Sequence, residues 1–300
     1  MCRRTGRFTL GPMPALIVAC VGLGFAASCA PPLQAPKHTP ASLPLHQAEQ
    51  AGNAASSTQT GKAAFPTTRT DNQEHERTDV YGSSRNGVPL TAYIFGKTPP
   101  TTIIFGGFHG DERSPPGVVE RLRTYLKAHP EARNGREVIL VPLANPDGYQ
   151  ARSRVNAAGV DINRNFPSDW KPKERAARYN PGPFANSEPE TRAIIGLLKK
   201  YTPSKIISIH QPKDCLNWDG AGGHALANEM QRFSGYKVVG DIGYPTPGSF
   251  GKYCDKQLGV GVVTLELPDI SVKAAWNDNQ TAFVAAIQYI PKAKFLTDRK

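Results

Sequence analysis

His109 and Glu112 combine two metal-ligating side chains, three positions apart, in a glycine-rich turn. They follow the apolar run 103–105 and the two glycines that end it, within the sequence IIFGGFHGDE. A tight turn of this kind lets a neutral imidazole and a carboxylate converge on one cation, and zinc accepts both ligand types. By itself the pair also fits an ordinary surface contact, so a third ligand elsewhere in the chain must decide between the two interpretations.

His210 supplies the candidate third ligand. It follows an apolar strand expected at 206–209, and the dipeptide Gln211-Pro212 then turns the chain. Two imidazoles and one carboxylate form the open three-ligand set that leaves a fourth zinc position for water. Such a site, with one Zn²⁺ per chain, makes a hydroxide-like nucleophile and polarises a carbonyl. We also expect the Gln211-Pro212 bond to be cis, because proline makes that isomer far less costly.

Glu266 is a carboxylate inside the otherwise apolar segment VVTLEL. A buried carboxylate is costly unless it is paired or has a function. One interpretation is a salt bridge to a buried arginine. The other is a general base that takes a proton from zinc-bound water and passes it to the leaving amine.

These side chains need a scaffold that brings distant segments together. Apolar segments predict strands, and apolar residues at helical spacing predict helices between them. This alternation indicates an α/β sheet with helices on both faces, in which functional groups gather at strand ends. The expected strands are 81–95, 101–105, 137–143, 206–209, 237–242 and 260–267, and the expected helices are 115–128, a capping-box helix from 187–190 through 198, 225–233 and 273–290.

The segment after the strand at 137–143 is the most polar part of the predicted domain. Asn145-Pro146-Asp147-Gly148 is a strong turn signal. The long loop that follows runs to Phe166-Pro167, and loops of this length tend to be functional or disordered. Its polar residues include Arg152, Arg154, Asp161, Asn163, Arg164 and Asn165.

Five motifs, in this order along the chain, resemble those of the zinc carboxypeptidase family, the M14 metallopeptidases. The resemblance covers residues 80–290 and implies a central mixed, twisted sheet with helices on both faces and no pro-domain. Further segments at 81–84, 154–161 and 244–251 are most similar to the murein peptide amidases, which cut the γ-D-glutamyl–meso-diaminopimelate bond. The five motifs are His109-x-x-Glu112, Asn145-Pro-Asp-Gly148, Asp161-Ile-Asn163-Arg164-Asn165, His210 and Thr264-Leu-Glu266.

The resemblance implies a role for each matching residue. His109, Glu112 and His210 take the zinc positions, and Glu266 takes that of the general base. Asp161 matches a carboxylate that orients the first zinc histidine, a partner that ligating imidazoles usually require. Arg154 matches the arginine that stabilises the tetrahedral oxyanion; Arg152 is its rival for this role, and a solvated charge is the other interpretation of Arg152.

Substrate recognition is implied in the same way. Asn163 and Arg164 match a clamp on the terminal carboxylate of the substrate, and Tyr244 matches a mobile lid tyrosine. Guanidinium geometry favours a bidentate contact with a carboxylate. In a murein tripeptide that carboxyl is free, whereas D-Ala blocks it in a tetrapeptide, so we expect tripeptide stems to be preferred. The far ammonium and carboxylate of diaminopimelate have candidate partners in Asp214, Lys252 and Asp255.

Residues 1–29 resemble an export signal, with three arginines, an apolar run from about residue 13 to 27, and small residues before Cys29. The alternative to an export signal is a transmembrane anchor, but the apolar run is short for spanning a bilayer. The end of the leader resembles the lipobox of bacterial lipoproteins, in which Cys29 becomes lipidated; ordinary cleavage is the other possibility. Residues 30–77 are rich in Ala, Pro, Ser and Thr, which predicts a disordered linker. Residues 78–300 are expected to form one catalytic domain. We expect this domain in the periplasm, anchored to a membrane through the lipidated cysteine.

Composition limits the choice of partners. The net charge is +11, or +8 without the three leader arginines, and no basic run is interleaved with aromatic residues. This excludes nucleic acid and suits an anionic polymer, a membrane surface or carboxylate-rich substrates. The resemblance implies peptidoglycan-derived peptides as the partners. In an exported protein Cys215 and Cys254 form either a disulfide or two buried free thiols.

Three other functions fit parts of the pattern. One is an ordinary carboxypeptidase for peptides with basic or acidic ends, and another is a deacylase of small N-acyl amino acids. The Asn-Arg-Asn-Phe-Pro segment at 163–167 favours peptides over the latter. The third is a wall-binding lipoprotein without catalysis, which loss of a ligand or of Glu266 would indicate; all four residues are present.

Overall fold

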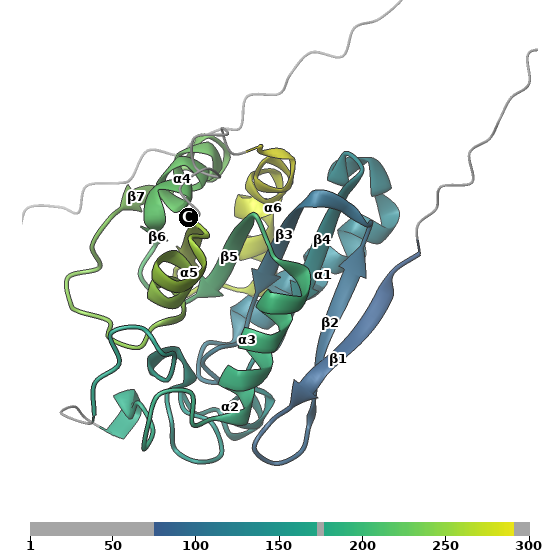
Figure 1. The fold of residues 1–300 in the computed structure, drawn as a ribbon. Helices are drawn as coiled ribbons and strands as arrows, with labels where there is room; N and C mark the ends of the chain where they lie inside the picture. The colour runs from purple at the N-terminus through teal and green to yellow at the C-terminus, as the bar shows by residue number, and fades with distance from the viewer. Residues whose placement is uncertain (1–74, 173–176, 291–300) are drawn as a thin grey trace, which may run out of the picture. The chain divides into compact units, whose positions relative to one another are not determined.

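An eight-stranded mixed sheet runs through the part of the chain that the computed structural model describes, residues 75–172 and 177–290. Its order is β1-β2-β4-β3-β5-β8-β6-β7, and β4, β3, β5 and β8 form a parallel centre. Figure 1 shows β1 to β5 side by side in this order. The predicted leader, Cys29 and most of the predicted linker lie outside the described residues. The strands are β1 (Arg77–Ser83), β2 (Pro89–Phe95), β3 (Thr98–Phe105), β4 (Arg136–Val141), β5 (Lys205–His210), β6 (Cys215–Asp219), β7 (Lys237–Val239) and β8 (Val262–Glu266).

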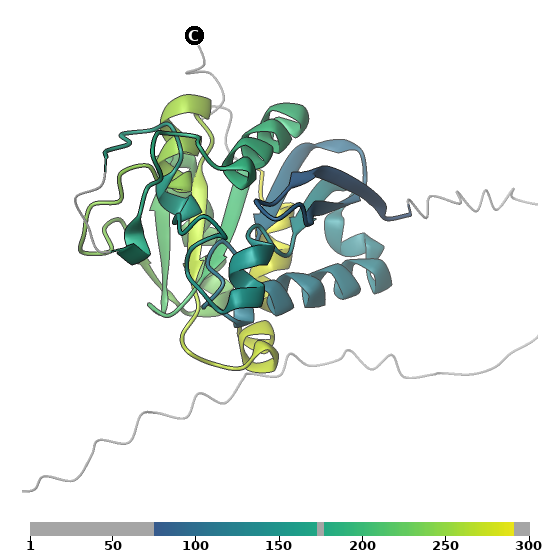
Figure 2. The ribbon, with the colours of Figure 1, turned by 90° about the horizontal axis from the view of Figure 1, so that it is seen from below.

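Helices cover both faces of this sheet, which confirms the predicted architecture (Figure 2). Successive residues of a strand point to opposite faces. Ile104 of β3 therefore packs in one cluster with α1, α4 and α6, whereas Ile103 and Phe105 pack in another with α3 and α5. The helices are α1 (Ser114–Ala128), α2 (Pro146–Ala151), α3 (Pro189–Tyr201), α4 (Gly220–Ser234), α5 (Phe250–Leu258) and α6 (Val272–Gln288).

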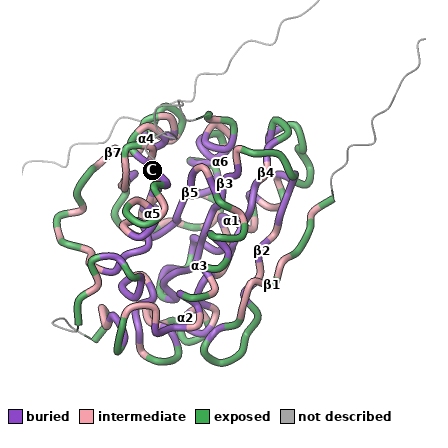
Figure 3. Tube along the Cα trace, viewed as in Figure 1, coloured by how far each residue is buried: buried purple, intermediate pink, exposed green. Residues whose placement is uncertain are grey.

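The central strands are buried along most of their length (Figure 3). All six residues of β5 and the last five of β3 are buried, as two-sided coverage of a parallel sheet requires. Each fully buried aliphatic side chain in such a strand stabilises the fold by roughly 1.5–3 kcal/mol. The sheet is thus a rigid platform for the residues at the carboxyl ends of its strands.

Four local predictions differ from the structure. The strand expected at 81–95 is a hairpin of β1 and β2, while β6 and α5 were not expected. The turn at Asn145 is the start of α2, where the Asn145 side chain accepts a hydrogen bond from the backbone N–H of Gly148. The capping box is wrong: Glu188 is the N-cap of α3 and makes no side-chain capping bond, because the Ser187 hydroxyl donates to the Glu188 carboxylate instead.

Other expectations can be checked directly. The Gln211–Pro212 bond is cis, as predicted. Cys215 and Cys254 are both buried free thiols, so the disulfide alternative is wrong. Within the described ranges, no helix has both the length and the apolar composition needed to cross a membrane.

Candidate metal centre

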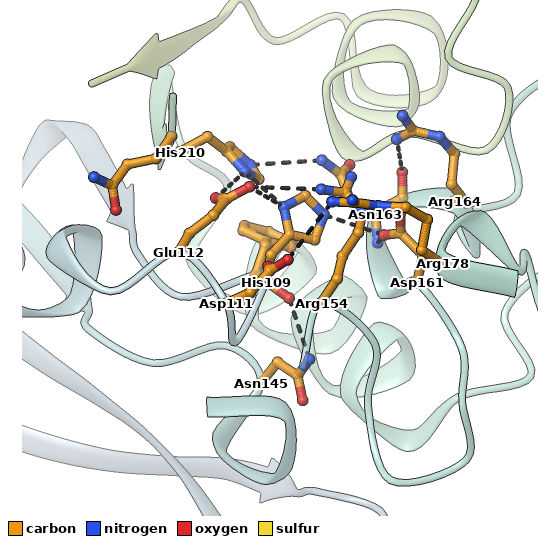
Figure 4. Close-up of polar contacts among 12 residues, drawn as sticks. His109, Asp111, Glu112, Asn145, Arg154, Asp161, Asn163, Arg164, Arg178 and His210 are labelled. Atoms are coloured by element: carbon orange, nitrogen blue, oxygen red, sulfur yellow. Dashed lines mark hydrogen bonds and ion pairs between the residues drawn. The ribbon is translucent and has the colours of Figure 1, made fainter. Parts of the chain in front are cut away.

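His109, Glu112 and His210 converge on one point, and Figure 4 shows their side chains turned toward one another. The Nδ1 atom of His109 lies 2.6 Å from Oε1 of Glu112, and Nδ1 of His210 lies 2.9 Å from Oε2 of the same carboxylate. The two Nδ1 atoms are 3.1 Å apart. All three side chains are buried, and the ligand atoms lie within 4.8 Å of one another.

The parallel pairing of β3 and β5 explains why residues a hundred positions apart meet. Phe105, the last residue of β3, is in register with Ser208, so the chain beyond β3 lies next to the end of β5. His210 is the last residue of β5. His109 and Glu112 lie on the turn between β3 and α1, at the same edge of the sheet. The site therefore stands at the carboxyl ends of parallel strands, where functional groups of α/β sheets gather.

A close backbone contact fixes the position of this turn. A Cβ atom added to Gly110 would lie 1.9 Å from the carbonyl carbon of Gly148, on α2. Because the obstacle is backbone, a side chain at 110 would displace one of the two segments. The N–H of Gly110 also donates to the carbonyl of Ser153, at 2.9 Å. Gly110 thus lets the ligand-bearing turn rest directly on the loop that follows β4.

Asp161 is fully buried behind His109. Its carboxylate accepts hydrogen bonds from Nε2 of His109 at 3.2 Å and from Nε of Arg154 at 3.0 Å. Burial alone would raise the pKa of Asp161, but His109 and Arg154 hold it well below its usual range. The carboxylate is therefore ionised, and it keeps the His109 proton on Nε2 so that the Nδ1 lone pair faces Glu112 and His210.

This donor set fits zinc. Two neutral imidazole nitrogens and a carboxylate are ligands that zinc prefers, and three of them leave a coordination position open. The Nδ1 atoms of His109 and His210 lie 3.1 Å apart and both face the carboxylate of Glu112, so the three side chains are placed to share one divalent cation. Among the residues that the structure describes, this is the one group of three or more histidine, cysteine or acidic side chains with such spacing.

Glu266 ends β8 beside this cluster. It is in register with His210 across the β5–β8 pair, and it lines the same pocket as the three ligands. Burial raises its pKa; His210 works against that effect, and Glu112 adds to it. No salt bridge involves Glu266 within the described part of the chain, so the structure offers no buried arginine partner for it. A carboxylate of raised pKa beside a metal site is suited to proton transfer.

The residues predicted to bind substrate surround the same pocket. Asn163 accepts a hydrogen bond from the N–H of Phe250 at 2.9 Å, and Nη1 of Arg164 donates to the carbonyl of Asn163 at 2.7 Å. Tyr244 also lines the pocket, on the segment before α5, whereas Arg152 is exposed and does not. The structure therefore brings the three candidate ligands together with Glu266, Arg154, Asn163, Arg164 and Tyr244 in one pocket, and Asp161 lies behind His109.

The pocket has a volume of about 460 Å³ and contains residues that sequence reasoning missed. Asp219 is the most notable, because it is an acidic side chain on a strand that was not expected. Neither Asp214, which is exposed, nor Lys252 or Asp255 lines this pocket. Further lining residues not singled out from the sequence are Arg178, Tyr179 and Asn217.

Comparisons with known proteins agree with this geometry. A family model described as zinc carboxypeptidase matches residues 67–221. The chain is 34% identical to murein peptide amidase A of Escherichia coli (strain K12) over 231 residues, which cover 72% of this chain and 91% of that relative. It is 31% identical to murein peptide amidase A of Vibrio campbellii, over 70% of this chain and 87% of the relative.

Solved structures show the same relationship. The crystal structure of murein-tripeptide amidase MpaA from Escherichia coli O157 is similar with a TM-score of 0.59 and 30% identity, covering 72% of this chain and 93% of that one. Carboxypeptidase A from Helicoverpa armigera gives a TM-score of 0.64 at 17% identity, over 76% and 70% of the two chains. At that identity the second similarity shows the fold alone.

Proposed function

The chain belongs to the zinc carboxypeptidase family, and from this we propose that it is a zinc-dependent amidase that hydrolyses peptidoglycan stem peptides at the γ-D-glutamyl–meso-diaminopimelate bond. The observation that carries the proposal is the convergence of His109, Glu112 and His210 in the pocket that also holds Glu266. The choice of substrate is supported by the similarity to proteins named murein peptide amidase A over nearly their whole length.

The residues of the pocket divide the chemistry among them. A zinc ion held by His109, Glu112 and His210 would polarise the scissile carbonyl and lower the pKa of a water molecule. Glu266 accepts a proton from the attacking water and returns it to the nitrogen of the leaving amine. Burial raises its pKa, which makes the carboxylate a stronger acceptor for the proton of the attacking water.

Arg154 is positioned to meet the charge that develops on the carbonyl oxygen. Its Nε donates to Asp161, and its Nη1 lies 3.6 Å from Glu112. A guanidinium has five N–H groups, so donors remain that can face the pocket, which Arg154 lines. Because Asp161 fixes the side chain in advance, little reorganisation is needed when the oxyanion forms.

Arg164 and Asn163 hold the free carboxylate of the leaving residue. Arg164 is buried except where it lines the pocket, and its bond to the Asn163 carbonyl fixes the guanidinium. A site that grips a carboxylate next to the scissile amide requires a chain end. Tripeptide stems provide one, and tetrapeptides carry D-Ala there instead.

The test compares L-Ala-γ-D-Glu-meso-diaminopimelate with the corresponding D-Ala-extended tetrapeptide, with products identified by mass spectrometry. We expect the tripeptide to be hydrolysed about 10- to 100-fold faster, the range that a lost charged hydrogen bond produces. Comparable rates on both would contradict the carboxylate clamp. Faster cleavage of blocked L-dipeptides with basic or acidic ends would instead support an ordinary carboxypeptidase.

We further propose that the chain is exported to the periplasm as a membrane-anchored lipoprotein. In this proposal residues 1–29 are a lipoprotein-type signal peptide, 30–77 a linker and 78–300 the catalytic domain. Support comes from the three arginines, the apolar run and the small residues before Cys29. Expression in a bacterium should give a palmitate-labelled, membrane-bound protein, and the Cys29→Ser variant should lose the label. An unlabelled wild-type chain would contradict lipidation.

A further inference from the structure

Asn156 is a buried amide in the loop that connects Arg154 to Asp161. Its backbone N–H donates to the carbonyl of Val160 at 2.8 Å, and its Oδ1 accepts the N–H of Val160 at 3.1 Å. These two bonds close the loop on itself. Arg154 and Asp161 lie just outside the closure, one on each side, and Nε of Arg154 donates to Asp161 at 3.0 Å. Asn156 therefore sets the spacing between these two side chains.

The side-chain amide of Asn156 connects this loop to the start of α3. Its Nδ2 donates to Oε2 of Glu188 at 2.9 Å and to Oε2 of Glu190 at 3.0 Å. These two residues, the acid pair, are both buried; Glu188 is the N-cap of α3 and Glu190 lies in its first turn. Both N–H bonds of one amide group thus hold the loop against a second element of the fold.

The acid pair is itself fixed by further donors. The Ser187 hydroxyl donates to Oε1 of Glu188 at 2.7 Å, and the backbone N–H of Arg85 donates to Oε1 of Glu190 at 2.8 Å. All four carboxylate oxygens therefore accept a hydrogen bond. Burial raises the pKa of Glu190 and Glu188 adds to this effect, while the N–H groups of Arg85 and Asn156 oppose it.

This arrangement is costly, which indicates a purpose beyond packing. Neither member of the acid pair forms a salt bridge within the described part of the chain, so neutral donors and the positive end of α3 must balance both charges. What the pair provides is a direction, because two fixed acceptors on one helix end hold a planar amide in a single orientation. The Arg154–Asp161 contact fixes the distance between those two residues, whereas the contact with α3 fixes where the loop that carries them stands.

We propose that Asn156 is a positioning residue, held by the acid pair so that Arg154 and Asp161 stay aligned with the metal centre. This inference deepens the proposed function, on which it rests. Neither Asn156 nor the acid pair lines the pocket, so their effect on the reaction passes through the loop. Breaking the contact should therefore slow catalysis in a protein that remains folded.

Asn156→Asp separates the two functions of the side chain. An oxygen remains for the N–H of Val160, but a second oxygen replaces the amide donor that faced the acid pair. We expect kcat to fall by about 10- to 100-fold with a much smaller change in KM. Zinc affinity should fall by about tenfold, because Asp161 shifts away from His109. Asn228→Asp adds the same charge at an exposed position of α4 and should change neither quantity.

Two further variants test the contact itself. In the double variant Asn156→Asp/Glu190→Gln the donor and the acceptor exchange places, because the new amide at position 190 donates to the new carboxylate at 156. Its oxygen still accepts the N–H of Arg85, so we expect kcat to recover to within about tenfold of wild type. Asn156→Ser adds no charge and is too short to reach the acid pair; its kcat should fall by about tenfold even if Asn156→Asp does not fold.

The outcomes separate this inference from the function on which it rests. Values of kcat are compared on whichever peptide the wild-type chain cleaves, and competition with a chromogenic chelator measures zinc affinity without a substrate. Cleavage of blocked L-dipeptides alone would overturn the proposed amide specificity and leave this test intact. Wild-type kcat and zinc affinity in folded Asn156→Asp or Asn156→Ser, or no recovery in the double variant, would overturn the role of Asn156. So would a loss of unfolding free energy with kcat unchanged.

Discussion

The buried carboxylate of Asp161 lies 3.2 Å from Nε2 of His109, on the side of the imidazole away from Glu112. This contact determines which ring nitrogen carries the proton, and so which one is free to bind a metal. Asp161 also accepts hydrogen bonds from Nε of Arg154 and from the N–H of Asn163. One side chain therefore holds the candidate metal ligand His109, the guanidinium of Arg154 and the backbone of Asn163 in place.

Replacing Asp161 by Asn should lower the affinity for zinc by about 10- to 100-fold, because an amide holds the His109 proton less firmly on Nε2. Competition with a chromogenic chelator measures this directly. Asp169→Asn is the control, since Asp169 is an exposed acid paired with Lys256. Unchanged zinc affinity in Asp161→Asn would show that the contact does not orient the ligand.

Arg154→Ala should reduce kcat by about 10²- to 10³-fold with little change in KM, the effect expected when one oxyanion donor is lost. Arg152→Ala is a matched control two positions away, because Arg152 is exposed and does not line the pocket. Zinc content must be measured for both, since Arg154 also contacts Asp161. If Arg152→Ala lost more activity than Arg154→Ala, the oxyanion role would belong to Arg152 and not to Arg154.

Gly110→Ala should destabilise the fold by roughly 1–3 kcal/mol, because the new methyl group would overlap the backbone of Gly148. Gly196→Ala is the contrasting change. It lies on the exposed side of α3, with nothing within 4 Å of an added Cβ, and should stabilise the protein by about 0.5–1 kcal/mol. Urea denaturation measures both. A neutral Gly110→Ala would mean that the turn bearing His109 can shift.

The two candidate histidine ligands and Glu266 could be singled out from the sequence because each stands at a strong local signal. His109 and His210 both follow apolar strands, and Glu266 is a charge inside another such segment. The parallel order of β3, β5 and β8 then brings the three together. The α/β architecture could be predicted for the same reason, since long apolar segments specify elements that are buried on both faces.

Asp219 was missed because its strand has no such signal. β6 is only five residues long, its residues Asn217 and Trp218 suggest no buried strand, and it is held by its antiparallel pairing with β8. The residues suggested from the sequence for the far end of the substrate were Asp214, Lys252 and Asp255. They lie in neighbouring segments and do not line the pocket. The error at Ser187 has a similar origin, because a hydroxyl that could cap a helix formed a bond to the adjacent Glu188.

The most direct test of the account is the release of free meso-diaminopimelate from L-Ala-γ-D-Glu-meso-diaminopimelate, followed by mass spectrometry. We predict release by the wild-type chain, loss of release after chelation, and recovery when zinc is restored. Glu266→Gln should bind zinc normally but release the product at least about 10²-fold more slowly. Undiminished release by a metal-free chain, or by Glu266→Gln, would contradict the assignment of this site.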